Sequence, residues 1–211
     1  MKPPTAETPS PRRDDGWWLW VDGVGGFLVL PGQRWTVGGA AAGGQVDIAI
    51  LADCPRDAGR IERQEEDYCW VDRDGGRTWL RHGDSLPLAG TARVTFGRPS
   101  PLSSSASLRV APPHRWLEPA DGVVLLEKSC LIGRGAGNHV VCPQAENTWT
   151  LTLGRDGWRA GRSGSGSWTP LTPGRRTVVG DVALTLEPMP TRPWDRDRDP
   201  DPAPQIGPGR A

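Results

Sequence analysis

Several residue types on which protein chemistry depends are scarce in this sequence. Its 211 residues include four cysteines, three histidines, two lysines and one tyrosine. Cys54, Cys69, Cys130 and Cys142 lie far apart and form no C-x-x-C pair of the kind used by zinc sites and redox centres. His139-x-x-Cys142 has a metal-like spacing, but two ligands do not complete a tetrahedral site. We therefore expect buried, reduced thiols and no metal or other cofactor, with a metal or redox site at His139 and Cys142 as the alternative.

An excess of charge of one sign is also missing. Basic and acidic side chains balance at 25 each, so the chain has no field that would attract nucleic acid or an anionic membrane. No apolar run reaches the roughly 18 to 20 residues of a membrane span, and residues 1–16 have no signal-peptide core. The sequence therefore predicts a cytoplasmic protein without nucleic-acid or membrane partners. The use of arginine in place of lysine is compatible with a GC-rich bacterial genome.

The common catalytic motifs do not occur either. The chain contains no G-x-S-x-G, no phosphate-binding loop and no H-E-x-x-H, and none of its histidines has a carboxylate partner at local spacing. Glu65 and Glu66 lie where a hairpin turn is expected, so solvation is their usual role. We expect a protein that is not an enzyme and takes no small-molecule substrate.

What the chain does have is the pattern of short strands. Glycine and proline, 28 and 22 residues, interrupt short apolar runs, and no segment keeps a helical period. The runs alternate apolar and polar residues, as half-buried strands do. The residues placed inward by this alternation are Val46, Ile48, Ile50, Trp149, Leu151, Leu153, Val182, Leu184 and Leu186. The sequence predicts an all-β fold of small antiparallel β-sandwiches.

Two pairs of matching blocks indicate an internal repeat. Residues 25–39 match 121–135, and residues 83–96 match 174–186, each time with one residue deleted. The predicted organisation, from the N-terminus, is a disordered tail (1–16), a first sandwich domain (17–98), a linker rich in proline and serine (99–104), a second sandwich domain (105–188) and a disordered C-terminal tail (189–211).

The two opening strands, 17–21 and 105–110, predict a surface feature. If Ala106, Leu108 and Val110 face the core, then Ser105, Ser107 and Arg109 face water. The same register turns Trp17, Leu19 and Val21 inward and Trp18 and Trp20 outward. Neighbouring exposed tryptophans are typical of interface hot spots, so this pair is a possible partner surface. The alternative is that they pack on the second unit or under a tail.

The order and spacing of these blocks resemble the forkhead-associated domain, an eleven-strand β-sandwich whose loops recognise phosphothreonine peptides. The segments that carry the resemblance are WTVGG (35–39), VDIAILAD (46–53), AGRIER (58–63), YCWVD (68–72) and LRHGDSLPLAG (80–90) in the first repeat, and CLIGRGAGNHVVCP (130–143) and LTPGRRTVVGDVALTLE (171–187) in the second. The resemblance covers nearly all of residues 17–98 and, more faintly, 105–188. It implies two tandem sandwiches with binding loops at one end.

The family's binding loops use an arginine after a glycine, a Ser-x-x-His and an Asn-Gly, which together hold the phosphate and the peptide main chain. In the first repeat the arginine, serine and histidine positions are Gly39, Pro55 and Ala58, and the asparagine position falls on Gly75 or is deleted. The second repeat keeps only Arg134. A hydrogen bond to a charged group contributes about 1.5 to 3 kcal/mol, so three losses amount to roughly 4 to 9 kcal/mol. Ordinary phosphopeptide affinity is not expected to survive.

Substitute basic residues flank the same loops. The predicted peptide-binding residues are Gly39, Arg56, Arg60, Arg77, Arg134, Asn138 and His139. Exposed arginines without a binding role are the simpler interpretation of the basic residues. The sequence thus predicts a non-enzymatic scaffold that binds protein or peptide partners without strict dependence on phosphate. The alternative is a phosphothreonine reader in bacterial serine/threonine kinase signalling that uses Arg134 and the substitute residues.

Overall fold

The chain is all-β, as the alternating patterns predict. A computed structural model describes residues 16–40, 46–101, 103–162 and 165–190, and these form 18 strands in three sheets and no helix. Consequently no helix among them is a candidate for crossing a membrane. The predicted disordered tails lie outside the described residues except at Gly16 and Met189–Pro190, where the N–H of Met189 donates to the carbonyl of Gly16.

The three sheets contain seven, six and five strands, named below in spatial order across each sheet. Sheet A consists of β17 (Thr177–Val179), β18 (Val182–Pro188), β1 (Trp17–Val21), β2 (Gly25–Pro31), β11 (Gly122–Leu126), β9 (Ala106–Val110) and β8 (Val94–Gly97). Sheet B consists of β10 (Arg115–Trp116), β4 (Ile48–Leu51), β3 (Arg34–Gly39), β5 (Gly59–Gln64), β6 (Asp67–Asp72) and β7 (Arg77–Leu80). Sheet C consists of β13 (Val140–Val141), β12 (Ser129–Gly133), β14 (Trp149–Gly154), β15 (Gly157–Arg162) and β16 (Trp168–Pro170).

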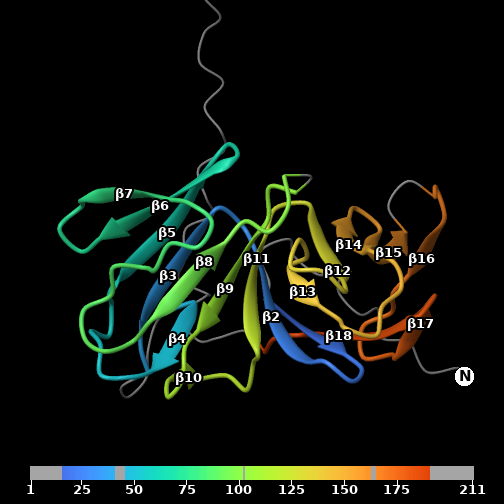
Figure 1. The fold of residues 1–211 in the computed structure, drawn as a ribbon, viewed down its shortest axis with the longest axis horizontal. Coiled ribbons are helices and arrows are strands. Elements are labelled where there is room, and N and C mark those ends of the chain that lie inside the picture. Colours follow the sequence, from blue (N-terminus) through green and yellow to red (C-terminus); the bar gives the residue numbers. More distant parts are fainter. Residues whose placement is uncertain (1–15, 41–45, 102, 163–164, 191–211) are drawn as a thin grey trace, which may run out of the picture.

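Sheet A is shared by two sandwiches, with β2 and β11 in the middle of the molecule (Figure 1). Successive side chains of a strand point to opposite faces. On β2, Leu28 joins the core under sheet B whereas its neighbour Val29 joins the core under sheet C. On β11, Val123 and Val124 divide in the same way. Sheet B and sheet C therefore cover opposite faces of sheet A, and we call the two halves the first and the second sandwich.

The opening strand of each repeat lies in the sandwich of the other repeat. β1 runs between β18 and β2 and contributes Trp17, Leu19 and Val21 to the core of the second sandwich. β9 runs between β8 and β11 and contributes Ala106 and Leu108 to the core of the first. The predicted linker, residues 99–104, lies between the two repeats along the chain, whereas each sandwich contains strands from both repeats.

Most pairs are antiparallel, as predicted, but three are parallel: β2 with β11, β3 with β4, and β12 with β13. The first of these joins the two repeats in sheet A. The other two occupy matching places in the two repeats. In each, the side chain that precedes the second strand accepts a hydrogen bond from a main-chain N–H of the first: Asp47 from Thr36 at 2.7 Å, and His139 from Leu131 at 2.9 Å. The repeat is therefore visible in local hydrogen bonding as well as in strand order.

The predicted inward positions are largely confirmed, with one clear error at β9. Val46, Ile48, Ile50, Leu151, Val182, Leu184 and Leu186 are buried, and Trp149 and Leu153 are partly buried. The prediction that Ser105 and Ser107 face water is wrong, since they are 0% and 8% exposed, while Arg109 is exposed as predicted. The second repeat covers this end of β9: the Ser105 hydroxyl accepts from the N–H of Glu127 at 2.9 Å, and its carbonyl accepts from the His139 ring at 3.0 Å. Burial of these serines is tolerated where their polar groups are paired.

Candidate functional site

The loop end of the first repeat is closed by main chain. The N–H of Gly39, at the end of β3, donates to the carbonyl of Pro55 at 2.7 Å. A Cβ on Gly38 would lie 1.7 Å from the carbonyl oxygen of Arg56, and one on Gly39 would lie 2.5 Å from that of Cys54. Glycine is required at both positions because the 54–57 main chain lies directly on the strand. The position that the family resemblance assigns to arginine has no room for a side chain.

Two of the predicted basic residues meet on the outer face of sheet B instead. Arg60 and Arg77 surround the carboxylate of Glu62, whose side chain is 8% exposed, together with Arg34. Arg60 Nε lies 2.7 Å and Arg34 Nε 3.4 Å from Oε1, while Arg77 Nη2 donates to Oε2. Burial raises the pKa of Glu62, but the hydrogen bond from Arg60 and the charges of the three arginines outweigh it and lower that pKa. Among the described residues, Arg56 takes part in none of these ion pairs.

Strand register explains why these side chains meet. Arg34 pairs with Glu62 and Thr36 with Arg60 across β3 and β5, and Val71 on β6 pairs with Arg60 on one side and Arg77 on the other. Because side chains directly opposite in a sheet share a face, the three arginines and Glu62 lie on one face of sheet B, opposite the face that packs on the core. Three guanidinium groups therefore face one carboxylate, which leaves a local surplus of two positive charges.

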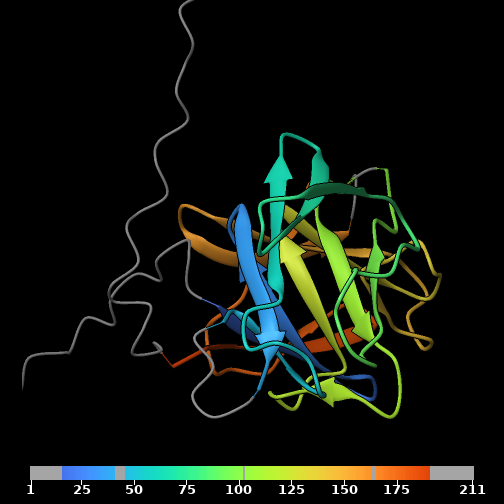
Figure 2. The ribbon, with the colours of Figure 1, turned by 90° about the vertical axis from the view of Figure 1, so that its left-hand side faces the viewer.

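An exposed tryptophan lies on the same outer face of sheet B as the arginines. Trp79 on β7 lies opposite Cys69, which itself lies opposite Glu62 on the same outer face. Trp79 is 58% exposed, more than any other described tryptophan. β7 is the edge strand of sheet B. Sheet B is on the side of the molecule that faces the viewer in Figure 2. We call the surface formed by Arg34, Arg60, Glu62, Arg77 and Trp79 the arginine–tryptophan face.

In the second repeat the retained arginine is already engaged. Arg134 follows β12 and is exposed, but its Nε donates to the carbonyl of Pro143 at 3.0 Å. Just after Pro143 in the chain, the N–H of Glu146 and the indole of Trp149 donate to the carboxylate of Asp181. Burial raises the pKa of Asp181, but these hydrogen bonds outweigh it and lower that pKa. The Asp181 carboxylate thus already accepts the hydrogen bonds that the Glu146 N–H and the Trp149 indole could offer to a ligand.

Asn138 and His139, predicted as binding residues, are buried and hold the loop in place. The Asn138 amide donates to the carbonyl of Gly135 at 2.9 Å. His139 Nδ1 accepts from the N–H of Leu131, so its ring proton is on Nε2, which donates to Ser105. Burial lowers the pKa of His139, although the bond to Ser105 raises it. With both ring nitrogens in hydrogen bonds, His139 has no free nitrogen to bind a metal.

Three of the four cysteines are buried, as predicted, whereas Cys54 is only partly buried and its thiol pKa is raised chiefly by burial. Cys69, Cys130 and Cys142 are buried free thiols, and burial raises the pKa of Cys130 to about 12. Among the described residues, no group of three or more histidine, cysteine or acidic side chains is placed to hold a metal ion.

Trp18 and Trp20 point away from the core of the second sandwich, as predicted, but they are only half-exposed. Their rings stack on each other with centroids 5.5 Å apart. Trp20 also covers Gly26 and donates its indole N–H to Glu187 on β18 at 3.0 Å. The pair therefore packs partly on a strand of the second repeat and offers less surface than Trp79.

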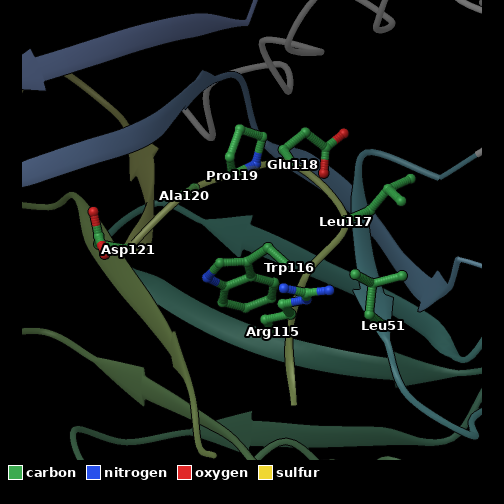
Figure 3. Close-up of a pocket in the computed structure, with 8 residues that line it drawn as sticks. All are labelled: Leu51, Arg115, Trp116, Leu117, Glu118, Pro119, Ala120 and Asp121. Atoms are coloured by element: carbon green, nitrogen blue, oxygen red, sulfur yellow. The ribbon is translucent and has the colours of Figure 1, made fainter. Parts of the chain in front are cut away.

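A shallow hollow opens at the opposite edge of sheet B (Figure 3). It has a volume of about 420 Å³, and its walls are Leu51, Arg115, Trp116, Leu117, Glu118, Pro119, Ala120 and Asp121. Leu51 and Leu117 are 37% and 48% exposed, but the carboxylate of Asp121 accepts from the N–H of Gly26 at 2.9 Å. The charges at its rim are of both signs, so the hollow has no single electrostatic preference.

Sequence reasoning missed Arg34, Glu62 and Trp79. The alternation was present in the sequence, since Arg60 and Glu62 are two apart, as are Arg77 and Trp79. Only the pairing of β3, β5, β6 and β7 brings the two pairs together. Comparison with models of protein families, with curated proteins and with solved structures gave no match.

Proposed function

We propose that this chain is a non-enzymatic protein-interaction module that binds a segment of a partner protein on the arginine–tryptophan face, and that binding does not require a phosphate on the partner. The observation that carries the proposal is the position of Trp79, which is 58% exposed, two residues from Arg77 on β7 and on the same outer face of sheet B as Arg34 and Arg60. Tryptophan and arginine are among the residues most enriched in interface hot spots.

The shape of the face favours a protein partner over a small molecule. The face lies on an open sheet, and the hollow beside Leu51 and Trp116 is lined by none of its residues. Small-molecule sites bury most of their ligand in a concave cavity, whereas this face lies on the outer side of a sheet. An extended or folded protein segment can cover such a sheet and exclude water from its centre.

Independence from phosphate is supported by the loop ends. At Gly38 and Gly39 the 54–57 main chain fills the space that a phosphate-binding side chain would need. At the second repeat, Arg134 donates to Pro143, and the Asp181 carboxylate takes the Glu146 N–H. A phosphate group beside Glu146 would be repelled by Asp181. The proposed relation to forkhead-associated domains is thus one of architecture, with the partner surface moved from loops to a sheet.

The second candidate is the phosphothreonine reader. It is favoured by Arg134, which is exposed directly after a glycine at the end of β12. Its remaining guanidinium nitrogens would supply donors to a phosphate.

Panning a random library of twelve-residue peptides against the full chain separates the two functions. One half of the library is treated with a serine/threonine kinase, and Trp79→Ala and Arg134→Ala chains are used in parallel. We expect enrichment of untreated peptides by the wild-type and Arg134→Ala chains, with loss of enrichment by the Trp79→Ala chain. Enrichment only from the treated half, lost with Arg134→Ala, would support the phosphothreonine reader instead. Equal enrichment by wild-type and Trp79→Ala chains would also contradict the proposal.

A further inference from the structure

We infer that the partner segment bound by the arginine–tryptophan face is acidic, with two carboxylates that pair with the surplus guanidinium charges while an apolar side chain on the same side of the segment covers Trp79. This inference rests on the proposed function and adds the chemistry of the partner.

The first step is the charge balance around Glu62. Arg34, Arg60 and Arg77 all contact this single carboxylate, and each contact uses one nitrogen of a guanidinium that has three. The side chains of these arginines stay 55%, 41% and 51% exposed. Guanidinium N–H groups therefore remain open to solvent on the outer side. Two further carboxylates would neutralise the surplus.

The second step is the orientation of the arginines. A free arginine loses much rotamer freedom when it binds, and this cost lowers affinity. On this face the carboxylate of Glu62, which is buried against the sheet, already forms ion pairs with all three guanidinium groups. The buried carboxylate therefore prepares the arginines for a second anion. Another carboxylate close to these strands, Asp47, is engaged by the N–H and the hydroxyl of Thr36 at 2.7 and 2.9 Å.

The third step separates an acidic protein segment from a nucleic acid. The chain carries 25 basic and 25 acidic side chains, so it has no net charge that would attract a polyanion over a long range. Binding of a nucleic acid relies on many phosphate contacts along the backbone. A patch of three arginines with a carboxylate at its centre and an exposed indole at its edge fits better a short segment whose acidic and apolar side chains lie on the same side. In an extended segment, residues two apart lie on one side, roughly 6 to 7 Å from each other.

Fluorescence anisotropy with defined peptides tests the inference on the full chain. The probe is an acetylated and amidated ten-residue peptide with a fluorescent label, in which glutamates and one valine take every second position and serine takes the positions between, so that the carboxylates and the valine share one side of the extended chain. Its twins carry glutamine or lysine in place of glutamate, and a single-stranded oligonucleotide of ten thymidines serves as the polyanion. The variants are Arg77→Ala, Trp79→Ala and, as the matched control, Arg155→Ala, since Arg155 is an exposed arginine at the turn between β14 and β15 of sheet C.

We expect the glutamate peptide to bind at least tenfold more tightly than the glutamine twin, and more tightly at 50 mM than at 500 mM salt because surface charges are screened. Trp79→Ala should weaken binding by about 30-fold, the loss typical of a hot spot, and Arg77→Ala by about 5- to 10-fold. Arg155→Ala should bind as the wild type does. Unchanged thermal melting of the variants shows that the fold is intact.

Equal or tighter binding of the glutamine peptide, the lysine peptide or the oligonucleotide overturns the inference. If neutral or basic peptides from the library still require Trp79, the proposed function stands and only the acidic partner is wrong. If Trp79→Ala changes binding of no peptide in either experiment, the proposed function fails as well.

Discussion

Leu19 and Leu108 occupy matching positions in the opening strands of the two repeats, but they lie in opposite sandwiches. Both side chains are 0% exposed, Leu19 in the core under sheet C and Leu108 in the core under sheet B. Replacing a fully buried leucine by alanine costs about 2 to 5 kcal/mol, and 3 kcal/mol corresponds to a factor of about 150 in an opening equilibrium. Leu19→Ala should therefore raise the exchange of amide hydrogens about 100-fold in β12–β18, and Leu108→Ala should do so in β3–β8.

Hydrogen exchange followed by mass spectrometry of peptic fragments measures this directly, because exchange reports local opening along the chain. Val178→Ala is the matched control, since Val178 is an apolar residue of sheet A that is 59% exposed, and its loss should change exchange little. The placement of β1 in the second sandwich and of β9 in the first is refuted if Leu19→Ala raises hydrogen exchange in β3–β8 and leaves β12–β18 unchanged. Equal effects of both substitutions on both halves would also refute the assignment of the two leucines to separate cores.

Two further predictions concern the loops that the family resemblance singled out. Because burial lowers the pKa of His139, its neutral form is favoured in the folded state, so stability is complete above the unfolded pKa of about 6.5 and falls as the pH drops below it. Urea unfolding should show that the free energy of unfolding falls less between pH 7 and pH 5 for His139→Gln than for the wild type or for the variant His82→Gln at an exposed site. Equal decreases in the three proteins would contradict this role of His139. Gly38→Ala should lower the free energy of unfolding by about 1 to 3 kcal/mol, because its Cβ would meet the Arg56 carbonyl. Gly135→Ala, whose Cβ would have its nearest neighbour at 4.0 Å, is the control, and equal stability of the two variants would argue against the close contact.

The residues of the arginine–tryptophan face show how much of a site can be predicted from the sequence. The sequence predicts Arg60 and Arg77 as basic residues available to a partner, and they do lie on one surface. It does not predict their common carboxylate, Glu62, or their neighbour Trp79. Alternation places Arg60 with Glu62 on one face of a strand, but it carries no information on which strand lies alongside. The opposite error occurs at Asn138 and His139, which are buried, because their sequence context resembles a loop end and does not reveal what covers it.

The sequence by itself determined that the protein is built from strands and which side chains of most strands point inward, since apolar alternation with a period of two is a local property of the chain. Only the tertiary structure decided that β1 and β9 each join the other repeat's sandwich. A strand with one apolar face can be buried by any core that covers that face. The choice between two similar cores depends on hydrogen bonds to neighbouring strands and on the twist of the shared sheet, and both arise only when residues far apart in the sequence come together.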